Sequence, residues 1–342
     1  MGCLKIYDRK ISEGAPVFII AEAADNHLGN MATAREMIRQ AKSAGADCIK
    51  FQHHLPDEEM LPDIPMSDNF EEPLYEFLKK NAITIEQHRE LKACCEKAGI
   101  IYLCTPFSYK AALELDSIGV EAFKIGSGEF TDLVSLRKIA ELNKPMILST
   151  GMSTPDEIRE TYNFLKQLDA NFGFMNCVSE YPPIYEDMNI GFIMALIDEF
   201  PDIVIGHSDH TPDLYTSFAA VALGARMIEK HITLDKHQKG PDRSVSIDMK
   251  DLTQLVDGIR KIEKTLGREK TVHEREKQIR QWALRSVVTT HDIPAGTLIK
   301  SEMLWTKRPG TGIPSRELHN FIGKRAKCFI KANTLLRRQD VE

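Results

Sequence analysis

Two short segments decide the fold, Ile203-Val-Ile-Gly-His-Ser-Asp-His210 and Ala225-Arg-Met-Ile-Glu-Lys-His231. Each is an apolar run of strand length that ends in a histidine, and a stretch of helical pattern, residues 212–224, separates them. A buried strand, a helix and a second buried strand form the unit that builds parallel sheets. Because parallel strands end at the same edge of a sheet, we expect His210 and His231 to converge on one divalent ion.

The same alternation runs through most of the chain. Apolar runs of strand length occupy residues 17–23, 46–52, 100–106, 122–128, 145–151, 172–179, 203–209 and 225–233, with helical patterns between them. Eight such units in roughly 250 residues predict an α/β fold, a (β/α)₈ TIM barrel. A doubly wound open sheet would also explain the alternation, but it would gather functional residues at one switch point. Here reactive groups end every run, which favours the barrel.

The pattern of apolar, polar and turn-forming residues changes after the last helical stretch. We predict a catalytic barrel domain over residues 1–267 and a small, mostly β domain over residues 285–342, where short β-like runs alternate with Pro and Gly turns. Residues 268–284 are rich in charge and read as a solvated linker or an exposed helix. A domain of that size has a marginal core, so it is expected to dock on something larger, and the linker allows this to be a neighbouring subunit.

Composition indicates an ordinary soluble enzyme. The 342 residues are 42% hydrophobic and carry a net charge of −6, which gives no support to nucleic-acid or membrane binding. No apolar stretch approaches the length of a membrane span, and the first residues lack the apolar core of a signal peptide. The seven scattered cysteines show no zinc-type spacing, so we expect a reducing, cytoplasmic location.

Two lysines are expected at the mouth of the barrel. Lys50 ends the second run and Lys124 lies in the fourth, and buried lysines need a counter-charge. Two lysines facing one mouth would repel each other unless an anion lies between them, and a phosphorylated carboxylate would serve. The hydroxyls of Thr105, Ser127 and Ser149 would add donors for phosphate oxygens, although each alone could be a helix cap.

The carboxylates at the strand ends have two interpretations. Glu22 either contacts a ligand or cation or makes a structural bond to a lysine of a neighbouring strand. Glu129 is either a general acid or base beside the anion or the partner of a lysine in a salt bridge. The two histidines leave positions for water and substrate, which suits Mn²⁺, Co²⁺ or Mg²⁺, whereas a single strand-end histidine is more often structural.

Several motifs in order resemble the sialic acid synthases. They are Glu22-x-x-x-Asn26-His27, Lys50-Phe-Gln52, Cys104-Thr105-Pro-Phe, Phe123-Lys124-Ile-Gly-Ser127-Gly-Glu129, Leu148-Ser149-Thr-Gly-Met, Gly206-His-Ser-Asp-His210-Thr, Glu229-Lys-His231 and Gly240-Pro-Asp242. The tail, with Lys307-Arg308-Pro-Gly-Thr-Gly-Ile, is similar to the antifreeze-like (SAF) domain that ends these enzymes.

The resemblance implies a reaction and leaves the sugar open. It implies condensation of phosphoenolpyruvate with an N-acetylmannosamine-type sugar, assisted by a metal, most simply Mn²⁺, with C–O cleavage and release of phosphate. Relatives that make legionaminic or pseudaminic acid use a 2,4-diacetamido-2,4,6-trideoxy-hexose instead. The residues themselves leave two alternative functions open. One is a class I aldolase with Lys124 or Lys50 as the Schiff-base lysine, and the other is a carbohydrate- or ice-binding protein, which only the tail suggests.

The resemblance also implies roles for individual residues. Phosphoenolpyruvate would be held by Lys50, Thr105, Lys124, Ser127 and Ser149, the metal by His210 and His231, and the sugar by Gln52, Asn69, Tyr181 and Asp242. Glu22, Glu129, Lys124 and His231 would be the catalytic residues. Arg308 would reach the active site from the tail of the other subunit of a domain-swapped homodimer.

Overall fold

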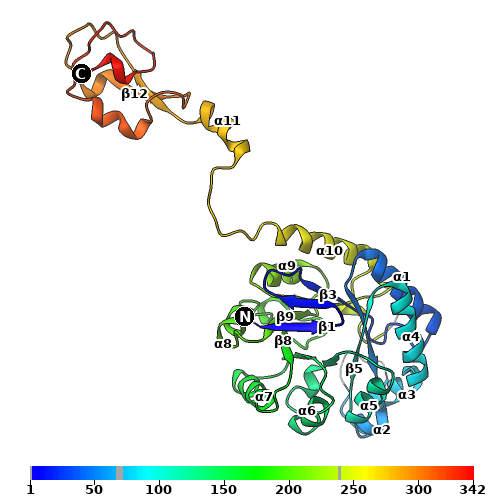
Figure 1. The fold of residues 1–342 in the computed structure, drawn as a ribbon. Coiled ribbons are helices and arrows are strands. Elements are labelled where there is room, and N and C mark those ends of the chain that lie inside the picture. The colour runs from blue at the N-terminus through cyan, green and yellow to red at the C-terminus, as the bar shows by residue number, and fades with distance from the viewer. Residues whose placement is uncertain (1, 67–71, 238–239) are drawn as a thin grey trace. The chain divides into compact units, whose positions relative to one another are not determined.

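The computed structural model describes residues 2–66, 72–237 and 240–342. Eight parallel strands form one sheet in the hydrogen-bonded order β5-β4-β3-β10-β9-β8-β7-β6. The strands at the two ends of that order, β5 and β6, contact each other, so the sheet closes into a barrel (Figure 1). The strands are β3 (Phe18–Glu22), β4 (Cys48–His53), β5 (Ile101–Pro106), β6 (Phe123–Ile125), β7 (Met146–Ser149), β8 (Phe172–Cys177), β9 (Val204–Asp209) and β10 (Met227–His231). The predicted TIM barrel is confirmed, and the open sheet is excluded.

A helix follows each strand and packs on the outside of the barrel (Figure 1). These helices are α1 (Met31–Ala44), α4 (Ile85–Ala98), α5 (Tyr109–Ser117), α6 (Leu133–Ala140), α7 (Pro155–Gln167), α8 (Phe192–Glu199), α9 (Tyr215–Ala222) and α10 (Met249–Glu263). Local sequence sets their ends: Asn30 caps the first turn of α1, and Gly45 ends that helix in the left-handed conformation. The fourth run is shorter than expected, because β6 ends at Ile125 and a 3₁₀ turn, η1 (Ser127–Glu129), follows.

Three further elements modify the barrel. A hairpin, β1 (Cys3–Ile6) and β2 (Arg9–Ser12), precedes it, and two helices, α2 (Pro56–Glu59) and α3 (Leu74–Asn81), are inserted after β4. The hairpin packs its buried apolar side chains against residues at the amino ends of the strands, such as Phe18. The amino end of the barrel is therefore filled, and the carboxyl ends of the strands are left for a site.

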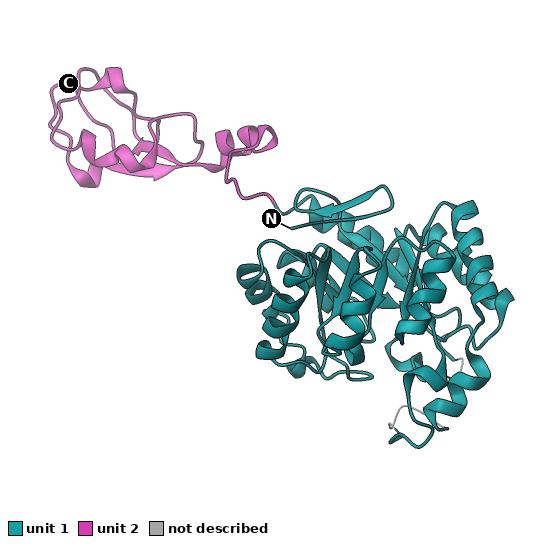
Figure 2. Cartoon of the chain, turned by 60° about the horizontal axis from the view of Figure 1, so that its bottom comes forward, with its two compact units in different colours: residues 1–266 teal, residues 267–342 magenta. Residues whose placement is uncertain are grey.

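The chain divides into two compact units, residues 1–266 and 267–342 (Figure 2). The second unit contains α11 (Glu274–Ala283), in which no residue is buried, and the antiparallel pair β11 (Ser286–Thr289) and β12 (Leu304–Lys307). It has a small apolar core of its own that includes Val287, Ile299 and Phe321. Among the described residues, no helix has both the length and the apolar character needed to cross a membrane.

Candidate active site

A cavity of about 440 Å³ opens at the carboxyl ends of the barrel strands. It brings together most of the residues that the sequence singled out: Glu22, Lys50, Gln52, Thr105, Lys124, Ser127, Glu129, Ser149, Tyr181, His210, His231 and Asp242. Asn69 lies outside the described residues, and Arg308 belongs to the second unit, where its guanidinium stacks on Trp282 at 5.3 Å.

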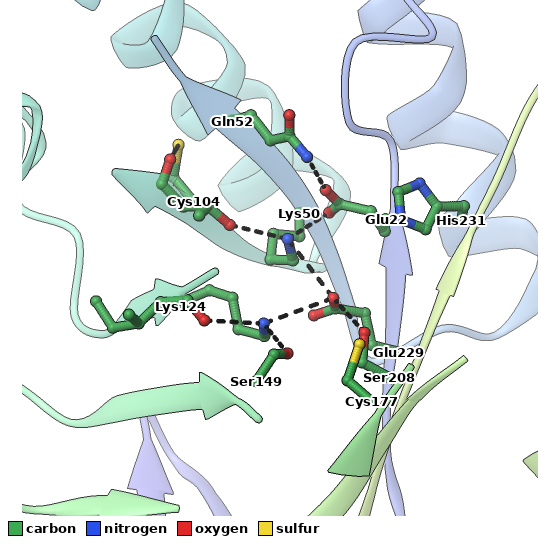
Figure 3. A network of polar contacts seen from close by, with 12 residues as sticks. Glu22, Lys50, Gln52, Cys104, Lys124, Ser149, Cys177, Ser208, Glu229 and His231 are labelled. Carbon is green, nitrogen blue, oxygen red and sulfur yellow. Dashed lines mark hydrogen bonds and ion pairs between the residues drawn. The ribbon is translucent and has the colours of Figure 1, made fainter. Parts of the chain in front are cut away.

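Two buried lysines share one carboxylate inside this cavity (Figure 3). Glu229 Oε1 lies 3.7 Å from Lys50 Nζ and 3.8 Å from Lys124 Nζ, and it accepts a hydrogen bond of 3.1 Å from Ser208. Burial opposes the charged form of Glu229, but the two lysines outweigh it and lower its pKa. Sequence reasoning required an anion between the lysines and assigned that place to the substrate. In the structure the chain supplies an anion itself.

Glu22 links three neighbouring strands. In the sheet register Glu22 lies beside Lys50 on one side and beside His231 on the other. Lys50 Nζ is 2.8 Å from Glu22 Oε2, and Gln52 Nε2 donates to Glu22 Oε1 at 2.9 Å. Burial raises the pKa of Glu22, and Lys50 counteracts that rise. The carboxylate is therefore paired with the lysine of a neighbouring strand while it still faces the cavity.

Hydroxyl groups surround the lysines. Lys50 Nζ donates to Thr105 Oγ1 at 2.9 Å, and Lys124 Nζ donates to Ser149 Oγ at 2.5 Å. Ser127 Oγ accepts from the backbone N–H of Gly151 at 3.2 Å. A Cβ at Gly151 would lie only 2.7 Å from that hydroxyl oxygen, so glycine is what allows this close packing. The cluster offers ammonium and hydroxyl donors that suit a phosphate or carboxylate.

Glu129 has a different environment from the other carboxylates. It lies on η1, directly after β6, and burial raises its pKa to about 7. Its Oε2 is buried and has no hydrogen-bond partner among the described residues. Within the ranges that the structure describes, no ion pair joins Glu129 to Lys50 or Lys124. A carboxyl group with that pKa can take up or release a proton near neutral pH.

The two strand-end histidines pack edge to face, with ring centroids 5.2 Å apart and ring planes at 67°. His210 Nδ1 lies 2.8 Å from the carbonyl oxygen of Val178, which only accepts, so Nδ1 carries the proton and Nε2 is left for a ligand. His231 Nδ1 is buried, has no hydrogen-bond partner among the described residues and lies 3.8 Å from Asp242 Oδ2. The Tyr181 ring packs against both imidazoles.

These histidines fit two ligands of an open metal site. In residues 2–66, 72–237 and 240–342, no group of three or more His, Cys, Asp or Glu side chains is arranged to hold one ion. Two imidazoles with one ring nitrogen directed by a backbone carbonyl suit an ion that completes its shell with water and substrate oxygens.

Sequence reasoning missed three features of the cavity. Glu229 was noted beside the histidines but not as the counter-ion of the lysines, although it is two residues from His231 and so shares its face of β10. Cys177 was given no role, but it lines the cavity, and its Sγ lies 4.0 Å from His210 Nδ1. His54 also lines the cavity, and no motif had assigned it a role.

Known proteins match both parts of the chain. Residues 37–271 match the NeuB family, and residues 285–342 match the SAF domain. N,N'-diacetyllegionaminic acid synthase of Campylobacter jejuni is 37% identical over 330 residues, which cover 93% of this chain and 98% of the relative. Human N-acetylneuraminate-9-phosphate synthase is 34% identical over 334 residues, 96% of this chain and 93% of its own. The crystal structure of N-acetylneuraminic acid synthetase from Leptospira borgpetersenii, in complex with citrate, superposes with a TM-score of 0.74 at 31% identity, covering 81% of this chain and 96% of that one. The chain therefore belongs to the NeuB family of sialic acid synthases and their legionaminic acid relatives, with a SAF domain at its carboxyl end.

Proposed function

We propose that this protein is a nonulosonic acid synthase that condenses phosphoenolpyruvate with an N-acetylmannosamine-type sugar and releases phosphate. One observation carries the proposal: two buried lysines, each bonded to a hydroxyl, lie in the same cavity as two imidazoles that pack against each other. The first group suits a small phosphorylated carboxylate, and the second would hold a divalent ion that could act as a Lewis acid toward a second substrate. The names of the relatives support the same reaction class.

The proposed reaction forms one C–C bond and breaks one C–O bond. C3 of phosphoenolpyruvate bonds to the aldehyde carbon of the open-chain sugar, and the aldehyde oxygen takes up a proton. Water adds to C2 and loses one proton. The bond from C2 to the phosphate oxygen then breaks while the new C2 hydroxyl loses its second proton and becomes the carbonyl, so that inorganic phosphate leaves. Lys50 and Lys124, with Thr105, Ser127 and Ser149, hold the phosphoenolpyruvate anion and offset its charge.

A divalent metal fits the histidine pair, and we propose Mn²⁺, with Co²⁺ or Mg²⁺ as alternatives. His210 and His231 would hold it, and it would supply a Lewis acid for the aldehyde oxygen of the sugar. The orientation of His210 by the Val178 carbonyl supports this role, because in the neutral ring it places the proton on Nδ1 and leaves the lone pair of Nε2 for a ligand.

Glu129 is our candidate for moving the proton of the attacking water. Glu22 is engaged by Lys50 and Gln52, whereas Glu129 keeps one buried carboxylate oxygen without a protein partner among the described residues. With its pKa raised to about 7 by burial, Glu129 can accept a proton and pass it on near neutral pH. Gln52, Tyr181 and Asp242 are left to contact the sugar.

A 2,4-diacetamido-2,4,6-trideoxy-hexose is the second candidate acceptor. Besides its polar groups, the cavity is lined by the apolar side chains of Met60, Leu74, Leu78, Phe107 and Met152. Such a wall suits a sugar with a methyl group in place of a hydroxyl, because a lost hydroxyl leaves no polar partner unpaired there.

A class I aldolase is a less favoured reaction. Burial lowers the pKa of Lys124, as a Schiff-base lysine would require. Glu229 at 3.8 Å acts in the opposite direction and favours the ammonium form. Trapping with borohydride in the presence of pyruvate separates the two, because only an aldolase would be inactivated.

We also propose a domain-swapped homodimer in which Arg308 of one subunit completes the active site of the other. Support comes from the exposed apolar side chains of α11 and of the residue after it, Ile279, Trp282 and Leu284, which a partner surface could cover. The cytoplasmic location remains a prediction, supported by cysteines that are all free.

The deciding experiment measures phosphate release from phosphoenolpyruvate with each acceptor sugar in parallel. Release that depends on N-acetylmannosamine supports the first proposal, and release that depends only on the 2,4-diacetamido-6-deoxy sugar assigns the second acceptor. No release with either sugar, in the presence of Mn²⁺, would contradict the proposed function.

A further inference from the structure

His54 lies in the wall of the cavity, directly after β4, and it is almost completely buried. Its Nδ1 is 2.9 Å from Glu59 Oε2, and its Nε2 is 3.0 Å from Gln52 Oε1. Its ring stacks on Phe107 with centroids 4.3 Å apart. Both ring nitrogens and one ring face are therefore engaged by the protein.

The direction of these hydrogen bonds follows from the chemistry of the partners. Gln52 Nε2 donates to Glu22 Oε1, so the amide oxygen of Gln52 must face His54 and accept. Lys50 Nζ lies 2.8 Å from the other carboxylate oxygen of Glu22. This positive charge favours the ionised form of Glu22, which can only accept hydrogen bonds. Glu59 is a carboxylate whose second oxygen accepts from the backbone N–H of Leu55. Both nitrogens of His54 must then carry protons.

The charges around His54 are consistent with an imidazolium. Asp25 Oδ2 lies 3.5 Å from Nε2, and Glu129 adds a further negative charge across the cavity. Burial disfavours the charged ring, but Asp25 and Glu59 outweigh it and raise the pKa of His54. The neighbouring imidazoles of His27 and His53 do not oppose it, because burial lowers their pKa and keeps them neutral.

We propose that the imidazolium of His54 is a positioning residue that fixes the direction of the Gln52 amide, so that the cavity presents an N–H donor to the acceptor sugar. One hydrogen of Gln52 Nε2 goes to Glu22, and the second has no protein partner among the described residues. A neutral His54 could not bond both Glu59 and Gln52 as donor, and the amide could then rotate and offer its oxygen. The inference rests on the proposed function, because it assigns the donor to the sugar.

Phenylalanine at position 54 is the sharpest substitution. His54→Phe keeps the stacking on Phe107 and removes both donors, so kcat/KM for the sugar should fall about 10- to 100-fold. The KM for phosphoenolpyruvate should change by less than about threefold, since the lysine cluster is untouched. His53→Phe is the matched control, because His53 is equally buried but bonds Glu114 on the other side of β4. It should alter thermal stability without changing the ratio of the two substrate constants.

A double-mutant cycle tests whether His54 acts through Gln52. In a Gln52→Ala background the loss of His54 should cost no more than about twofold, because the amide it orients is gone. Losses that multiply would overturn the proposal. Gln52→Glu keeps an acceptor for His54 but removes the N–H, and it should lower the sugar kcat/KM to the level of Gln52→Ala. Retained sugar activity in Gln52→Glu would also overturn it, even if His54→Phe does not fold.

Nitrogen-15 NMR of histidine-labelled wild-type protein tests the charge without any assay of turnover. The His54 signals, assigned by their absence from a His54→Phe or His54→Gln spectrum, should show both ring nitrogens protonated at about pH 7. One unprotonated nitrogen would overturn the proposal. If the wild type released no phosphate, the proposed function would fail, and the spectrum would still decide whether His54 is the imidazolium that the geometry requires.

Discussion

Replacing Lys124 with methionine should separate substrate binding from stability. The side chain is 2% exposed, donates to Ser149 Oγ at 2.5 Å and lies 3.8 Å from Glu229 Oε1. In Lys124→Met, phosphoenolpyruvate, the proposed substrate, should lose one charge-assisted contact, which costs about 1.5–3 kcal/mol, or roughly a 10- to 150-fold rise in its KM. The KM for the sugar should move much less.

Stability should respond differently from binding. Burial lowers the pKa of Lys124, which means that the charged form is unfavourable there, so a methionine of similar length relieves that cost. Glu229 does not become an isolated charge, because Lys50 at 3.7 Å and Ser208 at 3.1 Å remain. We therefore expect a melting temperature within about 3 °C of the wild type.

Lys230→Met is the matched control, since Lys230 is as buried but points to the helix layer. It lies 3.2 Å from Asp209, and its loss leaves that buried carboxylate unpaired, at a cost of about 3–5 kcal/mol. This corresponds to a melting temperature lower by roughly 6 to 20 °C. Steady-state kinetics and thermal unfolding of both variants make the comparison. If Lys124→Met lost stability as Lys230→Met does and weakened both substrates equally, Lys124 would be structural and the assignment of the lysine cluster would be refuted.

Four further outcomes are expected. His210→Ala or His231→Ala should abolish turnover with little change in melting temperature, and EDTA should silence the wild type until Mn²⁺ is added; an unchanged rate after chelation would remove the metal from the reaction. Glu129, acting as a base with its pKa raised to about 7, should give a rate that falls below about pH 7, and Glu129→Gln should flatten that limb. Burial holds the pKa of His88 well below the value of free histidine, so its contribution to stability is complete above about pH 6.5 and falls by about 1.4 kcal/mol per pH unit below it. Urea unfolding at several pH values should show a shallower slope for His88→Phe. Mixing inactive His231→Ala with inactive Arg308→Ala protein should restore activity after subunit exchange if the tails are swapped, and no recovery after verified exchange would argue against the swap.

The barrel could be predicted from the sequence because burial on both faces leaves a strong signal. A strand such as β9 is apolar throughout its first half and ends in polar groups, and a helix follows it. The β1–β2 hairpin, α2 and α3 were not predicted. These strands and helices are short. The hairpin is stabilised by contact with the amino end of the barrel, and such a contact leaves no signal in the local sequence.

The members of the site could be predicted more easily than their partners. The positions of Lys50, Lys124 and Glu229 in their strands predict that all three lie toward the carboxyl end of the barrel. The distances from Glu229 to the two lysines depend on how the strands are arranged around the closed barrel, which the sequence does not show. Charge balance therefore predicted that an anion lies between the two lysines, but not that a side chain of the protein supplies it. For His54, the sequence shows a pair of histidines, and only the hydrogen bonds to Gln52 and Glu59 distinguish it from His53.

The alternation of β10 divides two tasks between successive residues. Glu229 and His231 face the cavity, whereas Lys230 between them turns to the helix layer and donates to Thr211. Its ion pair with Asp209 is buried in the same place, and Asp209 accepts from the backbone N–H of Thr211 at 2.9 Å. The outward ion pair thus holds the segment that carries His210, at the end of β9, beside the strand that carries His231. Neither Lys230 nor Asp209 lines the cavity, so a change at Lys230 should affect the fold first and, through the positions of His210 and His231, the proposed chemistry.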